Sequence, residues 1–282
     1  MKNSSDKTKK QISLINRLVS LAIASAKIKT IEIQQKKRVW KGLYPPISLY
    51  IYAGYGSLKT TLLEEIEKKT GEGTIKKCTA AGLVGSIDDG RGLISPVWDH
   101  RGKVMAIDEF NVKGESGTET KQAILDIIEK GKYRKNIGRA VKNNVNIKDE
   151  NLFFRIKEGG ISFKTRCGAV ICTMVKHTAD TFHMALLSRC IPLSYSIDDP
   201  EMIFTGEIEW KIVNHKVKEH VKISLKDWEY IYRFSMDHSI NDKIRTASML
   251  ARVYAVLGKH DDELYGIICA LRNDVENTSV KW

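Results

Sequence analysis

The sequence lacks the features that mark membrane-spanning, secreted and zinc-folded proteins. No stretch reaches the roughly 18 to 20 consecutive apolar residues that a membrane helix needs. The first dozen residues are polar and basic, with no apolar signal-peptide centre. The five cysteines form no CxxC pair and the seven histidines form no HExxH pattern, which argues against a disulfide framework and a structural zinc site. We therefore expect a cytoplasmic protein without a membrane partner.

Internal repeats and low-complexity tracts are also missing, and the 42% hydrophobic and 28% charged residues are typical of a globular protein. The net charge of +12 indicates a polyanionic partner such as nucleic acid. A uniformly lysine-rich composition is the alternative. Ten Lys or Arg residues fall within residues 1–40, against two acidic residues there, and ten more within 131–166, against three acidic residues. This clustering favours nucleic-acid binding.

Apolar runs alternate with amphipathic segments along most of the chain. A helix is predicted over 11–38, and the KGLYPP sequence at 41–46 ends it. The predicted strands are 47–53, 103–108, 168–174 and 190–195; the helices between them are 60–71, about 119–131 and about 179–188. Helices are predicted after Pro200 near 207–220, 224–236, 243–257 and 261–272. The pattern predicts an α/β core with a parallel sheet at 41–196, preceded by a basic helical segment at 1–40 and followed by a helical domain at 197–282.

A phosphate-binding loop is predicted where the first strand meets its helix. The segment AGYGSLKTT resembles the pattern GxxxxGK[ST], with Ala53 and Leu58 in place of the two glycines. Backbone N–H groups and Lys59 would bind phosphate oxygens, and the Thr60 hydroxyl would hold Mg²⁺. A glycine-rich turn before a helix that begins with Lys-Thr is the alternative. The predicted nucleotide-binding residues are Ala53, Gly54, Tyr55, Gly56, Ser57, Leu58, Lys59, Thr60 and Thr61.

A second segment, VMAIDEF at 104–110, places two acidic residues at the end of a buried strand. The carboxyl ends of parallel strands are where open α/β sheets bind ligands. Asp108 would share the Mg²⁺ with Thr60, and Glu109 would orient and deprotonate the attacking water. The two segments together predict an ATPase that uses ATP and Mg²⁺.

Several segments resemble the AAA+ core of the minichromosome maintenance (MCM) replicative helicases. The loop of that family reads like GDPGxAKS. At the position of Leu58, the family also has an apolar residue in place of the second glycine. The other similar segments, in family order, are CTAAGLVGSI at 78–87, GKVMAIDEF at 102–110, ALLSRCIPL at 185–193 and NDKIRTASMLARVYAVLG at 241–258. The resemblance implies an AAA+ P-loop core with a helical lid, and a homo-oligomeric ring, expected to be a hexamer, that hydrolyses ATP.

The resemblance also implies roles for three further residues. Arg189 would be an arginine finger that acts on a neighbouring subunit's γ-phosphate, and Arg245 the sensor-2 arginine. The alternative for each arginine is an ordinary surface cation. The family places an Asn where Met174 stands, so Thr173 beside it is the candidate substitute for sensor 1.

The segment ENLFFRIKEGGISFKTRCG at 150–168 resembles the family's pre-sensor-1 hairpin, which projects into the ring channel. Its alternation around Gly159 and Gly160 predicts a β-hairpin. Arg155, Lys157 and Lys164 would then contact the phosphates of single-stranded DNA in a central channel. For the basic stretch at 132–149, DNA binding and a solvated loop both stay open.

The sequence has no room for the family's N-terminal OB-fold and zinc module or its C-terminal winged helix, so we expect a bare motor of the kind a mobile element such as an archaeal plasmid or virus would carry. The leading hypothesis is an MCM-type DNA motor used in replication. The alternative is an ATP-switched replication initiator or helicase loader with slow hydrolysis. An ATPase-driven transcription activator is disfavoured by the absence of a GAFTGA-like loop. The N-terminal helix is expected to pack on the core or on a neighbouring subunit, with membrane-surface binding as the alternative.

Overall fold

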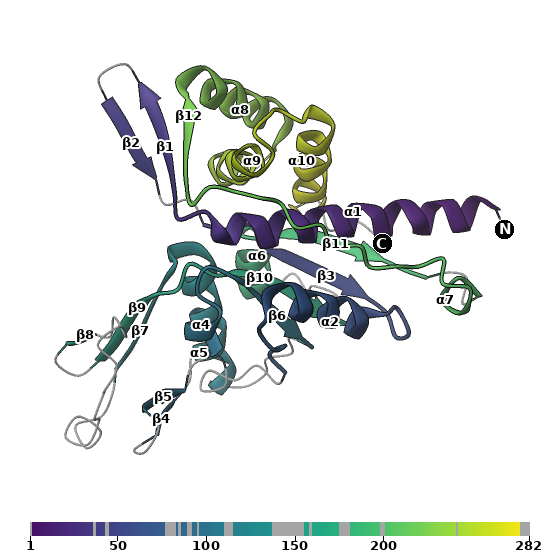
Figure 1. The fold of residues 1–282 in the computed structure, drawn as a ribbon, viewed down its shortest axis with the longest axis horizontal. Helices are drawn as coiled ribbons and strands as arrows, with labels where there is room; N and C mark the ends of the chain where they lie inside the picture. Colours follow the sequence, from purple (N-terminus) through teal and green to yellow (C-terminus); the bar gives the residue numbers. More distant parts are fainter. Residues whose placement is uncertain are drawn as a thin grey trace.

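The centre of the computed structural model is a parallel β-sheet. The structure describes residues 2–35, 38–42, 45–76, 83, 86–88, 92–94, 96–109, 115–136, 155–157, 160–174, 181–197, 201–240 and 242–276. Within these residues the sheet has the order β11-β3-β10-β6 (Figure 1). Its strands are β3 (Leu49–Ala53), β6 (Val104–Asp108), β10 (Gly168–Thr173) and β11 (Ile191–Tyr195). All four were predicted, with ends that differ by at most two residues.

Helices cover both faces of this sheet, which explains why its strands are apolar almost throughout. Successive residues of β3 alternate between two cores, with Leu49 and Ile51 in one and Tyr50 in the other. The helices on the first face are α1 (Lys2–Lys27) and α2 (Lys59–Thr70). Those on the second are α4 (Pro96–Asp99), α5 (Glu115–Leu125), the π-helical turn η1 (Asp126–Lys130) and α6 (Thr181–Leu187). The chain is therefore an α/β fold with a parallel sheet between helices.

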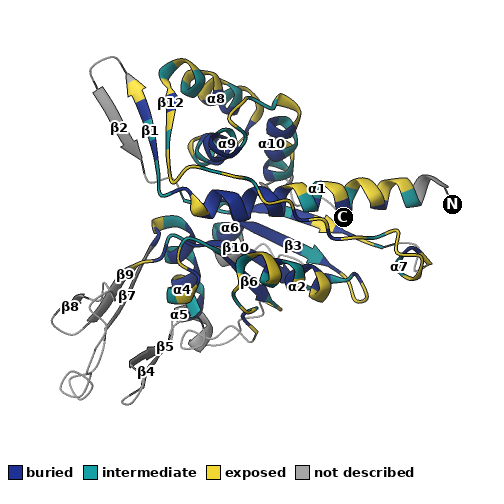
Figure 2. Cartoon of the chain, viewed as in Figure 1, coloured by how far each residue is buried: buried dark blue, intermediate teal, exposed yellow. Residues whose placement is uncertain are grey.

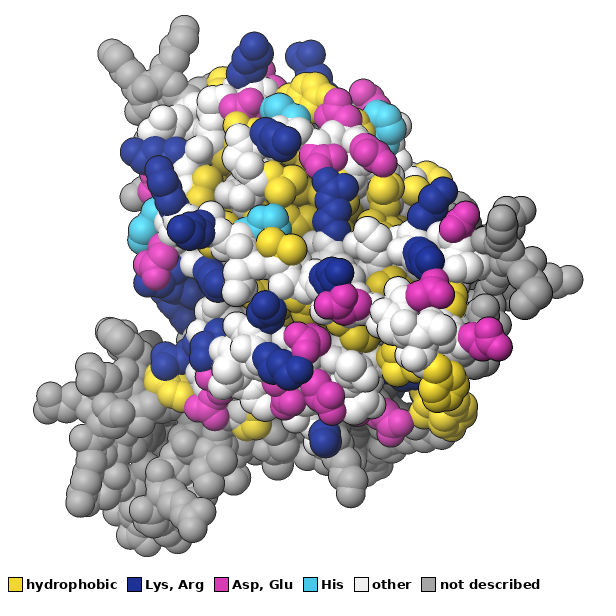
Figure 3. All heavy atoms as spheres, turned by 45° about the vertical axis from the view of Figure 1, so that its right-hand side comes forward, with side chains coloured by type: hydrophobic (Ala, Val, Ile, Leu, Met, Phe, Trp, Pro, Cys, Tyr) yellow, Lys and Arg dark blue, Asp and Glu magenta, His cyan; other side chains and the backbone are white. Residues whose placement is uncertain are grey.

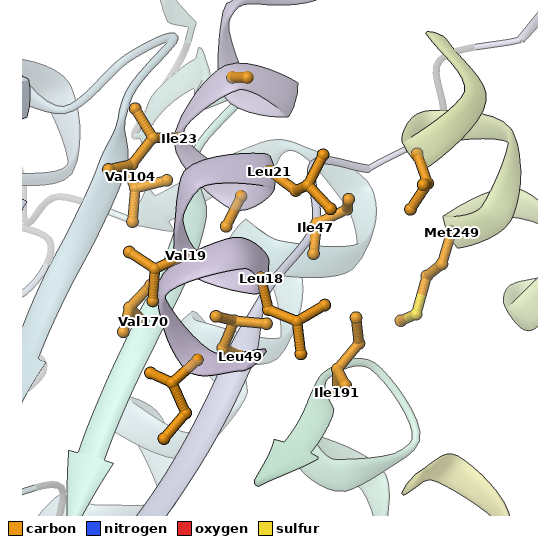
Figure 4. Close-up of a cluster of buried hydrophobic side chains, with 14 of the residues drawn as sticks. Leu18, Val19, Leu21, Ile23, Ile47, Leu49, Val104, Val170, Ile191 and Met249 are labelled. Atoms are coloured by element: carbon orange, nitrogen blue, oxygen red, sulfur yellow. The ribbon is translucent and has the colours of Figure 1, made fainter. Parts of the chain in front are cut away.

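The N-terminal helix α1 is part of the core. Leu18, Val19 and Leu21 are fully buried, and their side chains lie among strand residues such as Leu49 and Val170 (Figures 2 and 4). This confirms that the apolar positions of the helix pack on the core. The predicted extension of the helix to residue 38 is wrong, because strands β1 (Thr30–Gln35) and β2 (Arg38–Gly42) follow it.

The C-terminal part contains helices that pack together, namely α8 (Leu225–His238), α9 (Lys243–Leu257) and α10 (Asp262–Glu276). A short helix, α7 (Glu201–Phe204), precedes them. Strand β12 (His220–Ser224) pairs in parallel with β1, and β1 pairs antiparallel with β2. A segment from the N-terminal part of the chain therefore completes a sheet with a strand that leads into α8.

The helix predicted at 207–220 is wrong. Residues 207–219, called the connector below, are extended along α1 (Figure 1). The Asn16 side chain donates to the Glu209 carbonyl at 3.1 Å and accepts from the Lys211 N–H at 3.1 Å. The Val213 N–H donates to Ser20 Oγ at 2.9 Å. Because side chains of α1 satisfy these backbone groups, the connector needs no helix of its own.

A basic three-stranded antiparallel sheet with the order β7-β9-β8 lies apart from the central sheet (Figure 1). Its strands are β7 (Lys132–Asn136), β8 (Arg155–Lys157) and β9 (Gly160–Lys164). The antiparallel pairing of β8 with β9 confirms the predicted hairpin, and residues 137–154 lie outside the described part of the chain. A two-stranded sheet joins β4 (Ser86–Asp88) to β5 (Gly92–Ile94). Among the helices described, none is long and apolar enough to cross a bilayer.

Candidate nucleotide-binding site

Three predicted site elements meet at the carboxyl edge of the central sheet. The predicted phosphate loop leaves β3, Asp108 ends β6 and Thr173 ends β10. Strand β10 lies between the other two, with Cys172 opposite Asp108 and Thr173 opposite Tyr52. The sheet order therefore brings Asp108 and Thr173 to the edge where the loop before Lys59 begins. Thr173 is buried, whereas Asp108 is partly exposed.

The loop before Lys59 has a left-handed backbone at Leu58, the position where the GxxxxGK[ST] pattern has its second glycine. Leu58 has φ 60° and ψ 28°, in the left-handed region that favours glycine. For a residue with a side chain this conformation costs about 1 to 2 kcal/mol. The Leu58 side chain packs against the hydrophobic core, which helps to offset that cost. Gly56, with φ 68°, supplies a second left-handed residue.

Lys59 is folded back onto its own loop. Its Nζ donates to the carbonyl oxygens of Ala53 at 2.7 Å and Gly54 at 2.6 Å, and to Ser57 Oγ at 3.2 Å. Burial lowers the pKa of Lys59, while the nearby Asp108 is among the groups that oppose this shift. The ammonium group is therefore fully engaged, and a phosphate would have to replace these acceptors.

The first turn of α2 is open to an anion. It contains no acidic residue, and no side chain caps its N–H groups within this described helix. Thr60 and Thr61 are exposed, as are Gly54 and Tyr55 in the loop. Free N–H groups at a helix N-terminus, together with a nearby lysine, form a phosphate-binding arrangement.

Glu109 follows Asp108 and is exposed. Its φ of 49° lies in the left-handed region, which is unusual for a glutamate. Strained backbone of this kind clusters at functional sites. Both acidic residues therefore lie where the prediction placed them, at the end of the buried strand.

Two aromatic residues that sequence reasoning missed donate hydrogen bonds to backbone carbonyl groups of the loop. The Tyr195 hydroxyl donates to the Ser57 carbonyl at 2.7 Å, and Trp210 Nε1 donates to the Leu58 carbonyl at 3.2 Å. Their rings pack edge to face with centroids 5.8 Å apart. Tyr195 ends β11 and Trp210 belongs to the connector, so both the sheet and the connector fix the loop. Nothing in the local sequence pairs residues so far apart.

Arg189 and Arg245 lie together, but at the opposite edge of the sheet. Arg189 precedes β11, and the Tyr195 hydroxyl at the far end of that strand reaches the loop. A five-residue strand spans about 17 Å. Arg189 Nε and Nη2 donate to Glu129 Oε2 at 2.9 and 2.5 Å, and Arg245 Nη2 donates to Glu129 Oε1 at 2.7 Å. The structure therefore gathers both arginines at Glu129, away from the loop that precedes Lys59.

A further arginine fixes the backbone around Arg189. Arg272 of α10 donates to the carbonyl oxygens of Ser188 at 2.9 Å and Cys190 at 3.0 Å. It also donates to Thr246 Oγ1 at 3.0 Å. The C-terminal helices are thus tied directly to the turn that presents Arg189. Sequence reasoning missed Arg272 because no motif includes it.

The candidate DNA-binding residues lie on the basic sheet. Arg155 and Lys157 are in β8, opposite Ser162 and Gly160 of β9, and Lys164 ends β9 and is exposed. The three strands contain no Asp or Glu within their described bounds. Their basic residues are Lys132, Arg134, Lys135, Arg155, Lys157 and Lys164. This composition favours a polyanion.

The described residues contain no cluster of three or more His, Cys, Asp or Glu side chains that could hold a metal ion. A Mg²⁺ ion bound with a nucleotide would need Asp108, Thr60 and phosphate oxygens, which are the hard oxygen ligands that this ion prefers. The donors present at the carboxyl edge fit that requirement. No protein-family model matches this sequence, and a search of curated proteins finds no match.

Proposed function

We propose that this protein is an AAA+ ATPase of the MCM type that forms a ring and acts as a DNA motor in replication. The observation that carries the proposal is the meeting of three elements at one sheet edge. These are the loop before Lys59, the Asp108–Glu109 end of β6 and Thr173 on the strand between. Phosphoryl transfer requires a phosphate cradle, a carboxylate for Mg²⁺ and a group that orients water, and this edge offers a candidate for each.

In the proposed mechanism, Lys59 leaves the loop carbonyls and donates to phosphate oxygens, while the N–H groups of the first α2 turn bind the remaining oxygens. Asp108 and Thr60 would hold a Mg²⁺ ion, which would supply charge neutralisation when bound. Glu109 orients the attacking water and accepts its proton. The Thr173 hydroxyl, at the end of the strand between β3 and β6, donates a hydrogen bond to the attacking water or to the γ-phosphate.

The in-trans role of Arg189 follows from its distance from its own loop. A strand of about 17 Å separates it from the loop, so its guanidinium would meet a phosphate only on another subunit. Exposed apolar residues support a head-to-tail contact. Tyr55 of the loop is 89% exposed and Phe204 of α7 is 88% exposed. The carboxyl end of β3, where the loop begins, and α7 lie at the same end of the molecule (Figure 1). Ile244, beside Arg245, is 72% exposed.

Two unlike faces that fit one another close into a ring when the rotation between subunits allows it, and we propose a hexamer. The C-terminal helices form the proposed lid. Hydrophobic and charged side chains mix over the face in Figure 3. The basic sheet would contact the phosphates of single-stranded DNA in the channel, without reading its sequence.

The first experiment is size determination with Mg²⁺ and a non-hydrolysable ATP analogue, with and without single-stranded DNA. A hexamer that forms only with nucleotide supports the proposal. The next is strand displacement with ATP. Failure of both assembly and DNA-stimulated hydrolysis would overturn the proposal.

An ATP-switched DNA binder is the second candidate function. Leu58 in the loop, and Met174 where the resembling family has Asn, favour slow hydrolysis. The variant Glu109→Gln separates the two functions. A motor loses unwinding in this variant, whereas a switch retains or strengthens DNA binding because it stays in the ATP state.

A further inference from the structure

The carboxylate of Glu129 joins the two candidate arginines across three elements. Glu129 lies in the π-helical turn η1, Arg189 lies before β11 and Arg245 lies in α9. Each arginine takes a different oxygen of the same carboxylate, at 2.5 Å for Arg189 and 2.7 Å for Arg245. The Glu129 side chain is 31% exposed and that of Arg245 is 37% exposed, so a second molecule can reach the cluster.

Two guanidinium groups that converge on one anion form a phosphoryl-binding arrangement. The planar fork of arginine matches both carboxylate and phosphate oxygens. Burial by itself would raise the pKa of Glu129, but the hydrogen bonds from Arg189 and Arg245 outweigh it and lower that pKa. The carboxylate is therefore charged at neutral pH, and it satisfies the two cations as a bound phosphoryl group would.

We propose that Glu129 occupies, within its own subunit, the anion site that Arg189 and Arg245 offer to the terminal phosphoryl group of a neighbouring subunit's nucleotide. This inference rests on the proposed function and adds its regulation. An isolated subunit keeps both arginines on Glu129, and assembly on a nucleotide requires the phosphoryl group to displace the carboxylate. The exchange keeps the arginines from capturing other anions before assembly.

The backbone on either side of Arg189 and the side chain of Arg245 are held without Glu129, as an exchange requires. Arg272 fixes the turn at Ser188 and Cys190. Arg245 also donates to Asp242 Oδ2 at 2.9 Å and to Ser188 Oγ at 3.2 Å. The carboxylate is thus the removable partner. A π-helical turn such as η1 is a local widening that often occurs at functional sites.

The test compares Glu129→Gln with the wild-type chain. Glutamine keeps the size of the side chain but removes the charge that competes with phosphate. With Mg²⁺ and a non-hydrolysable ATP analogue, the protein concentration for half-assembly, measured by sedimentation, should fall about threefold or more. The variant Asp242→Asn, which loosens only Arg245, should shift it in the same direction but less. Both variants are checked for folding by thermal melting.

The matched control is Asp126→Asn in the same π-helical turn, because within the described residues Asp126 forms an ion pair with Lys130, at 2.7 Å, and none with either arginine. This control should assemble like the wild type. Unchanged or weaker assembly of Glu129→Gln overturns the inference, because Glu129 would then support the arginines permanently. Binding of a fluorescent ATP analogue to dilute wild-type protein is measured first. If no binding occurs, the proposed function itself fails, whatever the Glu129 variant does.

Discussion

At the residue scale, Leu58 holds a left-handed backbone conformation that glycine adopts more easily. Its φ of 60° is the value that a glycine supplies without strain. Substitution series at ordinary positions find alanine more stable than glycine, because glycine loses more entropy on folding. A left-handed position reverses that order. At position 58, therefore, the backbone conformation favours glycine although the residue is leucine.

We predict that Leu58→Gly is more stable than Leu58→Ala by about 1 kcal/mol, since both lose the packed side chain but only glycine relieves the backbone strain. The free energy of unfolding from urea titration measures this difference. The same pair of substitutions at exposed Thr61 in α2 should show the usual order, with alanine more stable. An alanine variant at 58 that equals or exceeds the glycine variant would contradict the left-handed conformation.

Glu129 gives a residue-scale prediction for pH. The pKa of this carboxylate in the folded protein is lowered from its ordinary value of 4.5. The unfolded chain therefore binds the proton more readily, and the stabilisation is present above about pH 4.5 and is lost as the pH falls through the folded pKa. Glu129→Gln should therefore be less stable than the wild type at pH 7. This difference in the free energy of unfolding should disappear in acid, where Glu129 is protonated in the wild type. Thermal melts from pH 7 to 3 check this, and parallel pH profiles of the two proteins would contradict it.

At the element scale, the connector and β11 position the phosphate loop. We predict that Trp210→Phe and Tyr195→Phe each weaken ATP-analogue binding, because each removes the donor to a loop carbonyl. Tyr195→Phe keeps its ring, and Trp210→Phe keeps a smaller aromatic ring in place of the indole. A lost buried hydrogen bond of this kind costs about 1 to 2 kcal/mol of stability. Calorimetric titration with Mg²⁺ and the analogue measures the affinity. Trp228→Phe on α8, distant in sequence from the loop, serves as control. Wild-type affinity in both loop-contacting variants would show that the loop holds its shape alone.

A second element-scale prediction concerns α1. Arg252 of α9 is buried, and its Nη1 donates to the carbonyl oxygens of Ser25 at 3.0 Å and Ile28 at 2.8 Å, beside the end of α1. Arg252→Met removes both hydrogen bonds from a buried site and should cost about 3 kcal/mol in urea denaturation. Arg233→Met, at an exposed position on α8, should change little. A small effect at Arg252 would mean that α1 docks through its apolar face alone.

At the scale of the whole molecule, Lys59 and Arg189 lie at opposite edges of the sheet, so a complete site needs two subunits if the proposed ring forms. Lys59→Ala and Arg189→Ala should each lack ATPase activity. An equal mixture should recover about a quarter of the wild-type rate, since random neighbours in a head-to-tail ring pair the two intact faces once in four contacts.

The control for this mixing experiment combines Lys59→Ala with Asp108→Ala, whose lesions lie on the same face and cannot complement. No recovery with Arg189→Ala would place the arginine in its own subunit's site, and recovery in this control would show that the regained activity does not report sites shared between subunits. Assembly of each variant with ATP analogue is measured alongside, because a chain that does not assemble cannot complement.

Much of the fold was predictable because its information is local. Each strand of the central sheet is a short apolar run, and α9 was predicted over its observed span of Lys243–Leu257. The connector was predicted wrongly as a helix. Ile208, Trp210 and Ile212 in fact recur every second residue, and Trp210 and Ile212 are buried, which is the spacing of an extended chain. The same spacing at Ile31 and Ile33 belongs to β1.

The sequence by itself determined the loop before Lys59, the Asp108–Glu109 strand end and the helix–strand alternation, since adjacent residues set each of them. Only the tertiary structure decided that β10 lies between β3 and β6, and that Glu129 holds Arg189 and Arg245. It also decided that Tyr195 and Trp210 donate hydrogen bonds to the loop. These contacts join residues that are far apart in the chain. Which distant residue a side chain contacts depends on how the whole fold packs, and no local sequence pattern encodes that.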